Sequence, residues 1–238
     1  MINAFKDLIV IEGSDGSGKK TQSEILLDYI HKNSSAHATI LDFPDYDSDT
    51  SKLIGAMLSG NFGDNAAELN PYFTSPMYAL DRYQYLDRYV RNEKFWPNTI
   101  GICNRYVDSN LIHQGCRLSG SDLVEYWNWL YDFEFNKLGI PRPSIVIYLD
   151  LPFEISYMNV VNRAKENGIT TDINEQKDYM ELVYNHVHKI ATIAGWKMID
   201  CYDKDLNAMK SKETIAKQIR HILYNSNLAS RAIYYDFD

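Results

Sequence analysis

One stretch near the start of the chain decides the fold: Leu8-Ile-Val-Ile-Glu-Gly-Ser-Asp-Gly-Ser-Gly-Lys-Lys-Thr-Gln22. Its first residues are apolar and β-branched, which is typical of a buried strand, and a helical pattern begins directly after the glycines. A strand, a glycine-rich loop and a helix in this order, with Gly13-x-x-x-x-Gly18-Lys19 at the junction, form the context of a phosphate-binding P-loop. The stretch therefore predicts a nucleotide site rather than an ordinary turn.

The loop would hold phosphates through its backbone and one side chain. Glycines let N–H groups point inward, and the following helix adds its positive N-terminal end. Lys19 can then reach the β- and γ-phosphates of a nucleotide. We expect nucleotide contacts from Gly13, Ser14, Asp15, Gly16, Ser17, Gly18, Lys19, Lys20 and Thr21. Lys20 stands where the motif usually has the Ser or Thr that binds Mg²⁺, and Thr21 comes one residue later.

Composition bounds the class of protein. The 238 residues are 45% hydrophobic and 24% charged, which suits one sizeable globular domain, 1–238. The net charge of -8 provides no basic field that would recruit nucleic acid. Cys103, Cys116 and Cys201 are odd in number and lack CxxC spacing, which favours a reducing compartment over a disulfide framework or a zinc site. Without a leader pattern or an apolar run near ~18 residues, we expect a cytoplasmic protein with no membrane partner.

Apolar and helical patterns alternate along the chain. Short strands are predicted over 9–11, 39–44, 99–103, 144–150 and 196–199. Helices are predicted over 51–58, 70–91, 122–138, 153–161, 179–194 and 213–224. The polar segment at about 162–178 is a candidate lid, and the acidic, aromatic tail at about 225–238 is expected to be peripheral. The alternation predicts an α/β fold, a parallel sheet with helices on both faces.

Marked polar groups follow several of the predicted strands. Besides the P-loop, they are Phe43 to Tyr46, Asn104 with Arg105, and Asp150. Ligands gather at the carboxyl ends of parallel strands, so these segments should converge on one crevice. A lysine on a donor phosphate and an arginine on an acceptor phosphate would suit phosphoryl transfer. Taken alone, Arg82 or Arg105 would more often be a surface ion-pair partner.

Aromatic residues crowd the predicted helix 122–138. Its apolar positions 123, 126, 127, 130, 131 and 138 fit one helical face. We interpret this face as core or subunit interface rather than as a ligand-binding aromatic box.

Six motifs, spread over most of the chain, resemble the thymidylate kinase family of P-loop nucleoside monophosphate kinases. They are Glu12 to Gln22, Phe43-Pro-Asp-Tyr46, Tyr78-Ala-Leu-Asp-Arg82, Asn104-Arg-Tyr-Val-Asp-Ser-Asn110, His113-Gln-Gly115 and Pro143 to Asp150. The resemblance implies the P-loop NTPase fold with a lid, ATP as phosphoryl donor, dTMP as acceptor, Mg²⁺ and a homodimer.

The resemblance also implies roles for individual residues. Tyr78 would stack on thymine, Arg82 would face the thymine edge, and Arg105 would hold the acceptor phosphate. Further substrate contacts would come from Asp15, Phe43, Tyr46, Ser109, Asn110 and His113. His113 stands where many members have a tyrosine against the sugar, so the choice between deoxyribose and ribose is left open.

The lid should supply a positively charged side chain to the phosphoryl transfer. Family members carry an arginine in the P-loop or in the lid, and this P-loop has Ser17 and no arginine. Arg163 is therefore the candidate, although a solvated helix end would look similar. The expected catalytic set is Asp15, Lys19, Arg105 and Arg163.

Three functions stay open at this stage. The first is transfer of phosphate from ATP to dTMP. The second is phosphorylation of another nucleoside or deoxynucleoside monophosphate. The third is nucleotide binding without turnover, which is motivated by Lys20 and by Asn104. The family usually has an aspartate at the position of Asn104. With these two residues, Mg²⁺ would depend on the substrate phosphates and water, and no metal-binding residue is assigned.

Overall fold

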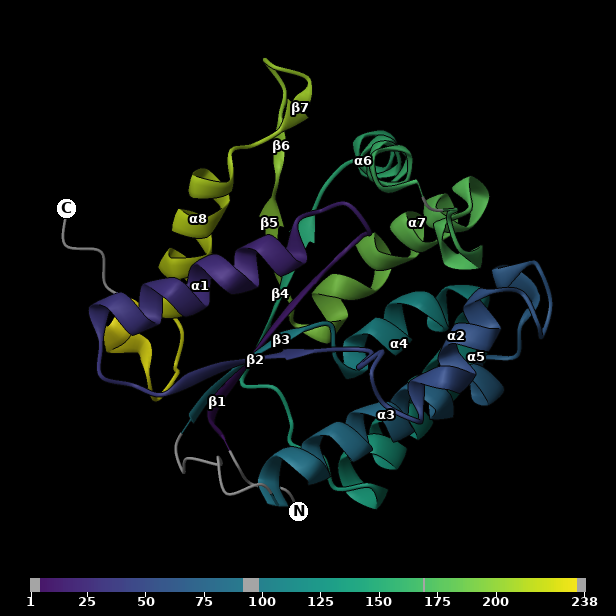
Figure 1. Ribbon diagram of the computed structural model, residues 1–238, viewed down its shortest axis with the longest axis horizontal. Helices are drawn as coiled ribbons and strands as arrows, with labels where there is room; N and C mark the ends of the chain where they lie inside the picture. Colours follow the sequence, from purple (N-terminus) through teal and green to yellow (C-terminus); the bar gives the residue numbers. More distant parts are fainter. Residues whose placement is uncertain (1–4, 92–98, 169, 235–238) are drawn as a thin grey trace.

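The computed structural model describes residues 5–91, 99–168 and 170–234, and a parallel sheet lies at its centre (Figure 1). Its strands are β1 (Phe5–Gly13), β2 (Ala38–Asp42), β3 (Thr99–Asn104), β4 (Ile145–Asp150) and β5 (Lys197–Asp200). They lie in the order β2-β3-β1-β4-β5, and every neighbouring pair is parallel. Because parallel strands need crossover connections, helices alternate with the strands along the chain.

The crossovers place helices on both faces of the sheet. The helices are α1 (Lys19–Asn33), α2 (Ser51–Leu58), α3 (Pro71–Arg91), α4 (Val107–His113), α5 (Gly120–Tyr131), α6 (Phe153–Asn167), α7 (Lys177–Ala194) and α8 (Lys212–Tyr224). Helices α1 and α8 lie on one side of the strands, and α3, α4, α5 and α7 lie on the other (Figure 1). The predicted α/β fold is confirmed. None of the helices in the described ranges is long and apolar enough to span a membrane.

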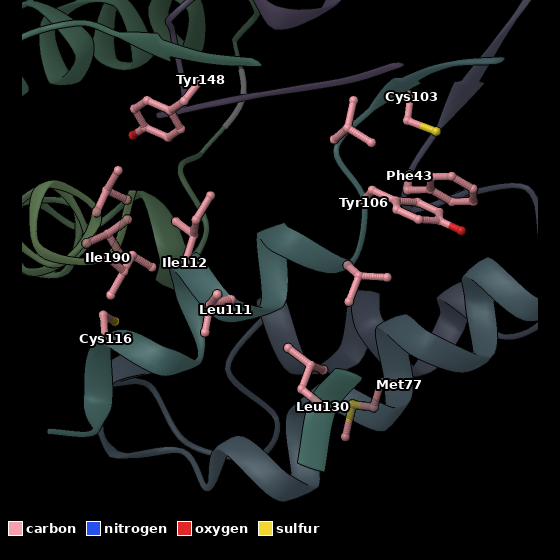
Figure 2. Packing of buried hydrophobic residues seen from close by; sticks show 14 of the residues in the cluster. Phe43, Met77, Cys103, Tyr106, Leu111, Ile112, Cys116, Leu130, Tyr148 and Ile190 are labelled. Atoms are coloured by element: carbon pink, nitrogen blue, oxygen red, sulfur yellow. The ribbon is translucent and has the colours of Figure 1, made fainter. Parts of the chain in front are cut away.

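Alternation along β1 divides the core into two layers. Leu8 and Val10 pack with residues of α3, α4, α5 and α7, whereas Ile9 and Ile11 pack against α1 and α8. Successive side chains of a strand point to opposite faces, so one apolar run serves both layers. Figure 2 shows part of the first layer, where Phe43 lies beside Tyr106 with ring centroids 5.9 Å apart.

The aromatic segment after α4 belongs to this first layer. Tyr126, Leu130 and Phe135 are buried in it. One helix was predicted over 122–138, but α5 ends at Tyr131 and a π-helix (Asp132–Lys137) continues it. The interpretation of this segment as core is consistent with its burial.

Other elements and boundaries also differ from the sequence predictions, and helix α4 was not predicted. Helix α6 runs on to Asn167, so the first part of the expected lid is helical, and only a short connection with a 3-10 turn (Ile173–Glu175) precedes α7. A small antiparallel hairpin, β6 (Tyr202–Asp203) and β7 (Ala208–Met209), was not predicted, since its strands are too short to show a pattern.

The expectation of a peripheral tail is wrong for residues 225–234. Leu228 and Tyr234 are buried in the second core layer with α1 and α8. The carboxylate of Asp7 accepts bonds from the backbone N–H and the hydroxyl of Ser230, at 2.9 and 2.5 Å. The tail therefore caps the end of the sheet where β1 begins.

Candidate active site

The P-loop between β1 and α1 borders a cavity of about 550 Å³. Gly16 has a φ of 82°, and a side chain there would come within 2.8 Å of the carbonyl oxygen of Ser156 on α6. Helix α6 binds the loop from outside: the hydroxyl of Ser156 donates to the carbonyl of Asp15 at 2.5 Å, and the amide of Asn159 donates to that of Gly16 at 3.0 Å. Two loop carbonyls therefore accept hydrogen bonds from α6 on the outside of the loop. This arrangement suits a loop whose N–H groups point inward to bind an anion.

Lys19 opens α1 and points back into the loop. Its ammonium group donates to the carbonyl oxygens of Gly13 and Ser14, both at 2.9 Å, and lies 3.4 Å from Asp15 Oδ1. Burial and the nearby guanidinium of Arg105 lower the pKa of Lys19 to about 8. The group stays largely protonated at neutral pH, and the two carbonyl oxygens hold it at the cavity, where a phosphate could replace them.

Arg105 follows β3 and meets Asp15 from the other side. Its φ of 66° is left-handed, a conformation that costs a non-glycine residue about 1–2 kcal/mol and is common at functional sites. One guanidinium nitrogen donates to the carboxylate of Asp15. Burial alone would raise the pKa of Asp15, but Arg105 and Lys19 hold that pKa well below its usual range. Asp15 is therefore an ionised group between two cations.

His113 at the end of α4 completes this group. Its Nε2 lies 3.1 Å from a nitrogen of Arg105. Because a guanidinium only donates, Nε2 must accept, and the ring is neutral with its proton on Nδ1. Burial and Arg105 lower the pKa of His113 to about 3, in agreement with this geometry.

Glu12 lies beneath the site at the end of β1 and is fully buried. Its carboxylate accepts bonds from the N–H of Tyr106 at 2.9 Å and from the hydroxyl of Ser109 at 2.8 Å. Burial raises the pKa of Glu12 to about 7. Glu12 thus joins β1 to the segment that carries Arg105.

The wall formed by α3 and α4 carries residues that were expected to bind the nucleotide that accepts the phosphate. Tyr78, Arg82, Ser109 and Asn110 all line the cavity. Arg82 is only 2% exposed, and its guanidinium bonds both carboxylate oxygens of Glu134 in the π-helix. The arginine is therefore held at the wall by an acid from another element.

The lid segment reaches the cavity from α6 and the connection to α7. Arg163 lines the cavity and forms an ion pair with Glu175 at 2.5 Å. Asp172 accepts bonds from the N–H groups of Asn174 and Glu175. Burial and the charge of Glu175 raise the pKa of Asp172 to about 6.

Thr21, Asp42 and Asn104 offer oxygen atoms that could support Mg²⁺ at the cavity. Across the described ranges, the acidic, His and Cys side chains form no cluster of three or more that could hold a metal ion. Thr21 and Asp42 line the cavity, and Asp42 accepts a bond from the amide of Asn104 at 2.6 Å. The other amide atom of Asn104, Oδ1, is buried without a partner. These residues fit a cation that arrives on nucleotide phosphates and keeps most of its waters.

A comparison with models of protein families now adds to this geometry. Residues 11–213 match the model described as thymidylate kinase. The chain belongs to the thymidylate kinase family. It is therefore a kinase that phosphorylates dTMP with ATP, and the other functions left open by the sequence are not favoured.

Relatives from distant organisms agree with the family. A probable thymidylate kinase of Pyrococcus horikoshii is 28% identical over 211 residues, which cover 89% of this chain and 92% of that protein. A thymidylate kinase of Mycobacterium tuberculosis is 29% identical over 191 residues, covering 79% and 87%. The solved thymidylate kinase of Candida albicans superposes with a TM-score of 0.65 at 18% identity, covering 96% and 93% of the chains, and supports the P-loop NTPase fold.

Most residues expected in this kinase site lie around the one cavity. From the P-loop and α1 it is lined by Asp15, Gly16, Gly18, Lys19, Lys20 and Thr21. From the other segments it is lined by Phe43, Tyr46, Tyr78, Arg82, Arg105, Ser109, Asn110, His113 and Arg163. Gly13, Ser14 and Ser17 are not in its wall, and the hydroxyls of the two serines are buried without partners. Phe43 is only 4% exposed and packs mainly in the core, while Tyr46 is 65% exposed.

Several residues at or behind this cavity were not assigned from the sequence. Ser156 and Asn159 bind the P-loop, Asp172 and Glu175 border the lid side, and Glu134 holds Arg82. The sequence did contain a signal for the last one. Glu134 continues the series Tyr126 and Leu130 at a spacing of four, so it is a single acid in an apolar helix stripe and needs a buried partner.

Proposed function

We propose that Lys19 and Arg105 hold the two phosphate groups that react, one on each side of Asp15. Phosphoryl transfer depends mainly on positioning and on neutralising charge on the moving group. The observation that carries the proposal is that both cations contact the same carboxylate at one cavity. The γ-phosphorus of ATP leaves its β-phosphate oxygen and bonds a phosphate oxygen of dTMP in one in-line step.

The remaining wall residues would orient dTMP. Tyr78 offers a ring for stacking, which is worth roughly 1–3 kcal/mol per base but tolerates different bases. Discrimination then requires hydrogen bonds, which Arg82 and Asn110 can supply from the same wall. His113 presents a neutral ring next to Arg105. Arg163 would swing from Glu175 to the transferring phosphate.

When bound with ATP, Mg²⁺ would supply charge neutralisation on the nucleotide phosphates. Oxygen atoms of Thr21, Asp42 and Asn104 would bind its water molecules. Lys20 is exposed and lies beside them at the cavity.

We also propose a homodimer that forms through segments 70–91 and 122–138. Support comes from α3, where Phe73, Leu80 and Tyr83 are 47%, 47% and 37% exposed at helical spacings of seven and three. Val124 on α5 is 57% exposed. The reducing interior of the cell is the proposed location, because all three cysteines are unpaired and buried.

The test is a coupled ADP-release assay with a panel of monophosphates on the parent and on Arg105→Ala. Loss of a charge-assisted contact costs about 2–5 kcal/mol in a desolvated site. The variant should therefore show a raised KM for dTMP and a lower kcat, with little change in the KM for ATP. Lys52→Ala, which removes an exposed cation paired with Asp49, is the control. Weaker ATP binding with unchanged use of dTMP would place Arg105 on the donor side and contradict the proposal.

A further inference from the structure

A fully buried acid in the π-helix connects the two residues that could recognise the base. Glu134 Oε2 accepts a bond from Arg82 Nε at 2.7 Å, and Oε1 accepts one from a terminal nitrogen of Arg82 at 2.5 Å. The amide of Asn110 also donates to Oε1, at 3.2 Å. Arg82 and Asn110 both line the cavity, whereas Glu134 does not. The acid therefore lies directly behind this part of the wall.

Further bonds fix the orientation of both wall residues. The second terminal nitrogen of Arg82 donates to the carbonyl of Tyr106 at 3.2 Å, and the Asn110 amide donates to the carbonyl of Ser75 at the same distance. A guanidinium has five N–H groups. Three are used in these contacts, so two stay available on a group that cannot rotate.

The arrangement is costly if its only purpose is stability. Burying an ion pair requires desolvation of both charges, and an apolar pair of similar volume is often at least as stable. A bidentate pair does, however, set the plane and direction of the arginine. Orientation is thus the property that this pair supplies and an apolar pair would not.

The π-helix explains how the acid reaches this position. The N–H of Leu138 bonds the carbonyl of Phe133, five residues earlier, so the turn is wider than in an α-helix. The carbonyl of Glu134 accepts a bond from the N–H of Ile140. Such π segments occur frequently at functional sites. Phe135 on the next position is buried in the core and holds the turn in place.

We propose that Glu134 is a positioning residue for base selection, acting through Arg82. The inference rests on the proposed role of Arg82 at the base. The fixed guanidinium lines the cavity and keeps two N–H donors for a ligand. Donors at this wall suit a pyrimidine that carries a carbonyl oxygen at its edge and disfavour one with an amino group there. Without Glu134, Arg82 would lose its direction and this preference would weaken.

The experiment compares Glu134→Gln, Arg82→Gln and the double variant. Glutamine keeps the size of glutamate but has one acceptor oxygen instead of two and no charge. We expect Glu134→Gln to raise the KM for dTMP and its calorimetric dissociation constant by between about 10-fold and 100-fold. The KM for ATP should be unchanged. The ratio of kcat/KM for dTMP over dCMP should fall. Because Glu134 acts through Arg82, the double variant should be no worse than Arg82→Gln.

A matched control is Asp7→Asn, which alters another buried, hydrogen-bonded carboxylate. Asp7 lies near the start of β1, at the end of this strand away from the P-loop. The control variant should lower the melting temperature without changing dTMP affinity or selectivity. If Glu134→Gln does not fold, the double substitution Glu134→Leu with Arg82→Met removes both charges and should show the selectivity loss of Arg82→Gln.

Two results would overturn the proposal. One is a lower melting temperature in Glu134→Gln with parental dTMP affinity and selectivity. The other is additive losses in the double variant. A parent that binds dTMP but does not turn it over would contradict the proposed function alone, since calorimetric affinities would still test Glu134.

Discussion

At the scale of single residues, the ammonium group of Lys19 is held at the cavity by the P-loop. Lys19 bonds two loop carbonyls and is 7% exposed at the cavity. Lys19→Ala should lower kcat by at least about 100-fold, because loss of one preorganised donor to a reacting group has effects of this size. The melting temperature should change little, since Asp15 keeps its ion pair with Arg105. Steady-state kinetics and thermal melting measure the two quantities.

The matched control for Lys19 is Lys32→Ala, an exposed lysine in the last turn of the same helix. It should retain parental kinetics. Near-parental activity of Lys19→Ala would contradict the assignment of the P-loop.

His113 links the site to acid stability. Its pKa is about 3 in the folded protein, against 6.5 for an unperturbed histidine. Between these values the unfolded chain binds a proton that the folded protein does not, so stability falls as the pH falls below 6.5. His113→Gln keeps an acceptor for Arg105 and cannot titrate.

Unfolding of the parent and of His113→Gln should be compared from pH 7.5 to pH 4.5. The parent should lose up to about 1.4 kcal/mol more than the variant for each pH unit below 6.5. Parallel stability curves would mean that His113 is protonated when folded, against the geometry at Arg105.

At the scale of elements, helix α6 connects the P-loop to the lid. Its first turns bind the loop through Ser156 and Asn159, and Arg163 follows one turn later beside Glu175. Arg163→Ala should lower kcat by about 100-fold with a near-parental KM for dTMP, because the charge is needed on the transferring phosphate.

Lys165→Ala is the control for the lid, since this lysine is exposed on the same helix. It should leave kcat unchanged. If both variants lose activity equally, the effect comes from the helix as a whole, and parental kcat in Arg163→Ala would exclude the arginine from the reaction.

At the scale of the whole molecule, the exposed apolar side chains of α3 should be covered by a second copy. Leu80→Glu places a charge in the middle of the proposed interface, where burial without a partner is strongly unfavourable. We expect a dimer for the parent and a monomer for the variant, by light scattering at micromolar concentration. Ile193→Glu on α7, which is 77% exposed, should remain dimeric. A monomeric parent would contradict the proposed assembly.

The sequence by itself determined the local architecture and the kind of chemistry. The order of strand, glycine loop and helix depends on residues close together in the chain, and so does the alternation that covers both faces of the sheet. The convergence of the P-loop with Arg105 could be predicted because parallel strands end at one edge. The types of most elements were predicted for the same reason, with ends shifted by a few residues, but α4 and the hairpin of β6 and β7 were missed.

Only the tertiary structure decided which buried charges meet. Arg82 and Glu134 lie 52 residues apart, and Asp7 meets Ser230 across 223 residues. Periodicity shows that a charge is buried but not which group satisfies it, because the partner comes from another element. The wide π turn at Glu134 and the burial of the tail have the same origin. Both follow from packing against elements distant in the chain, which outweighs local preference.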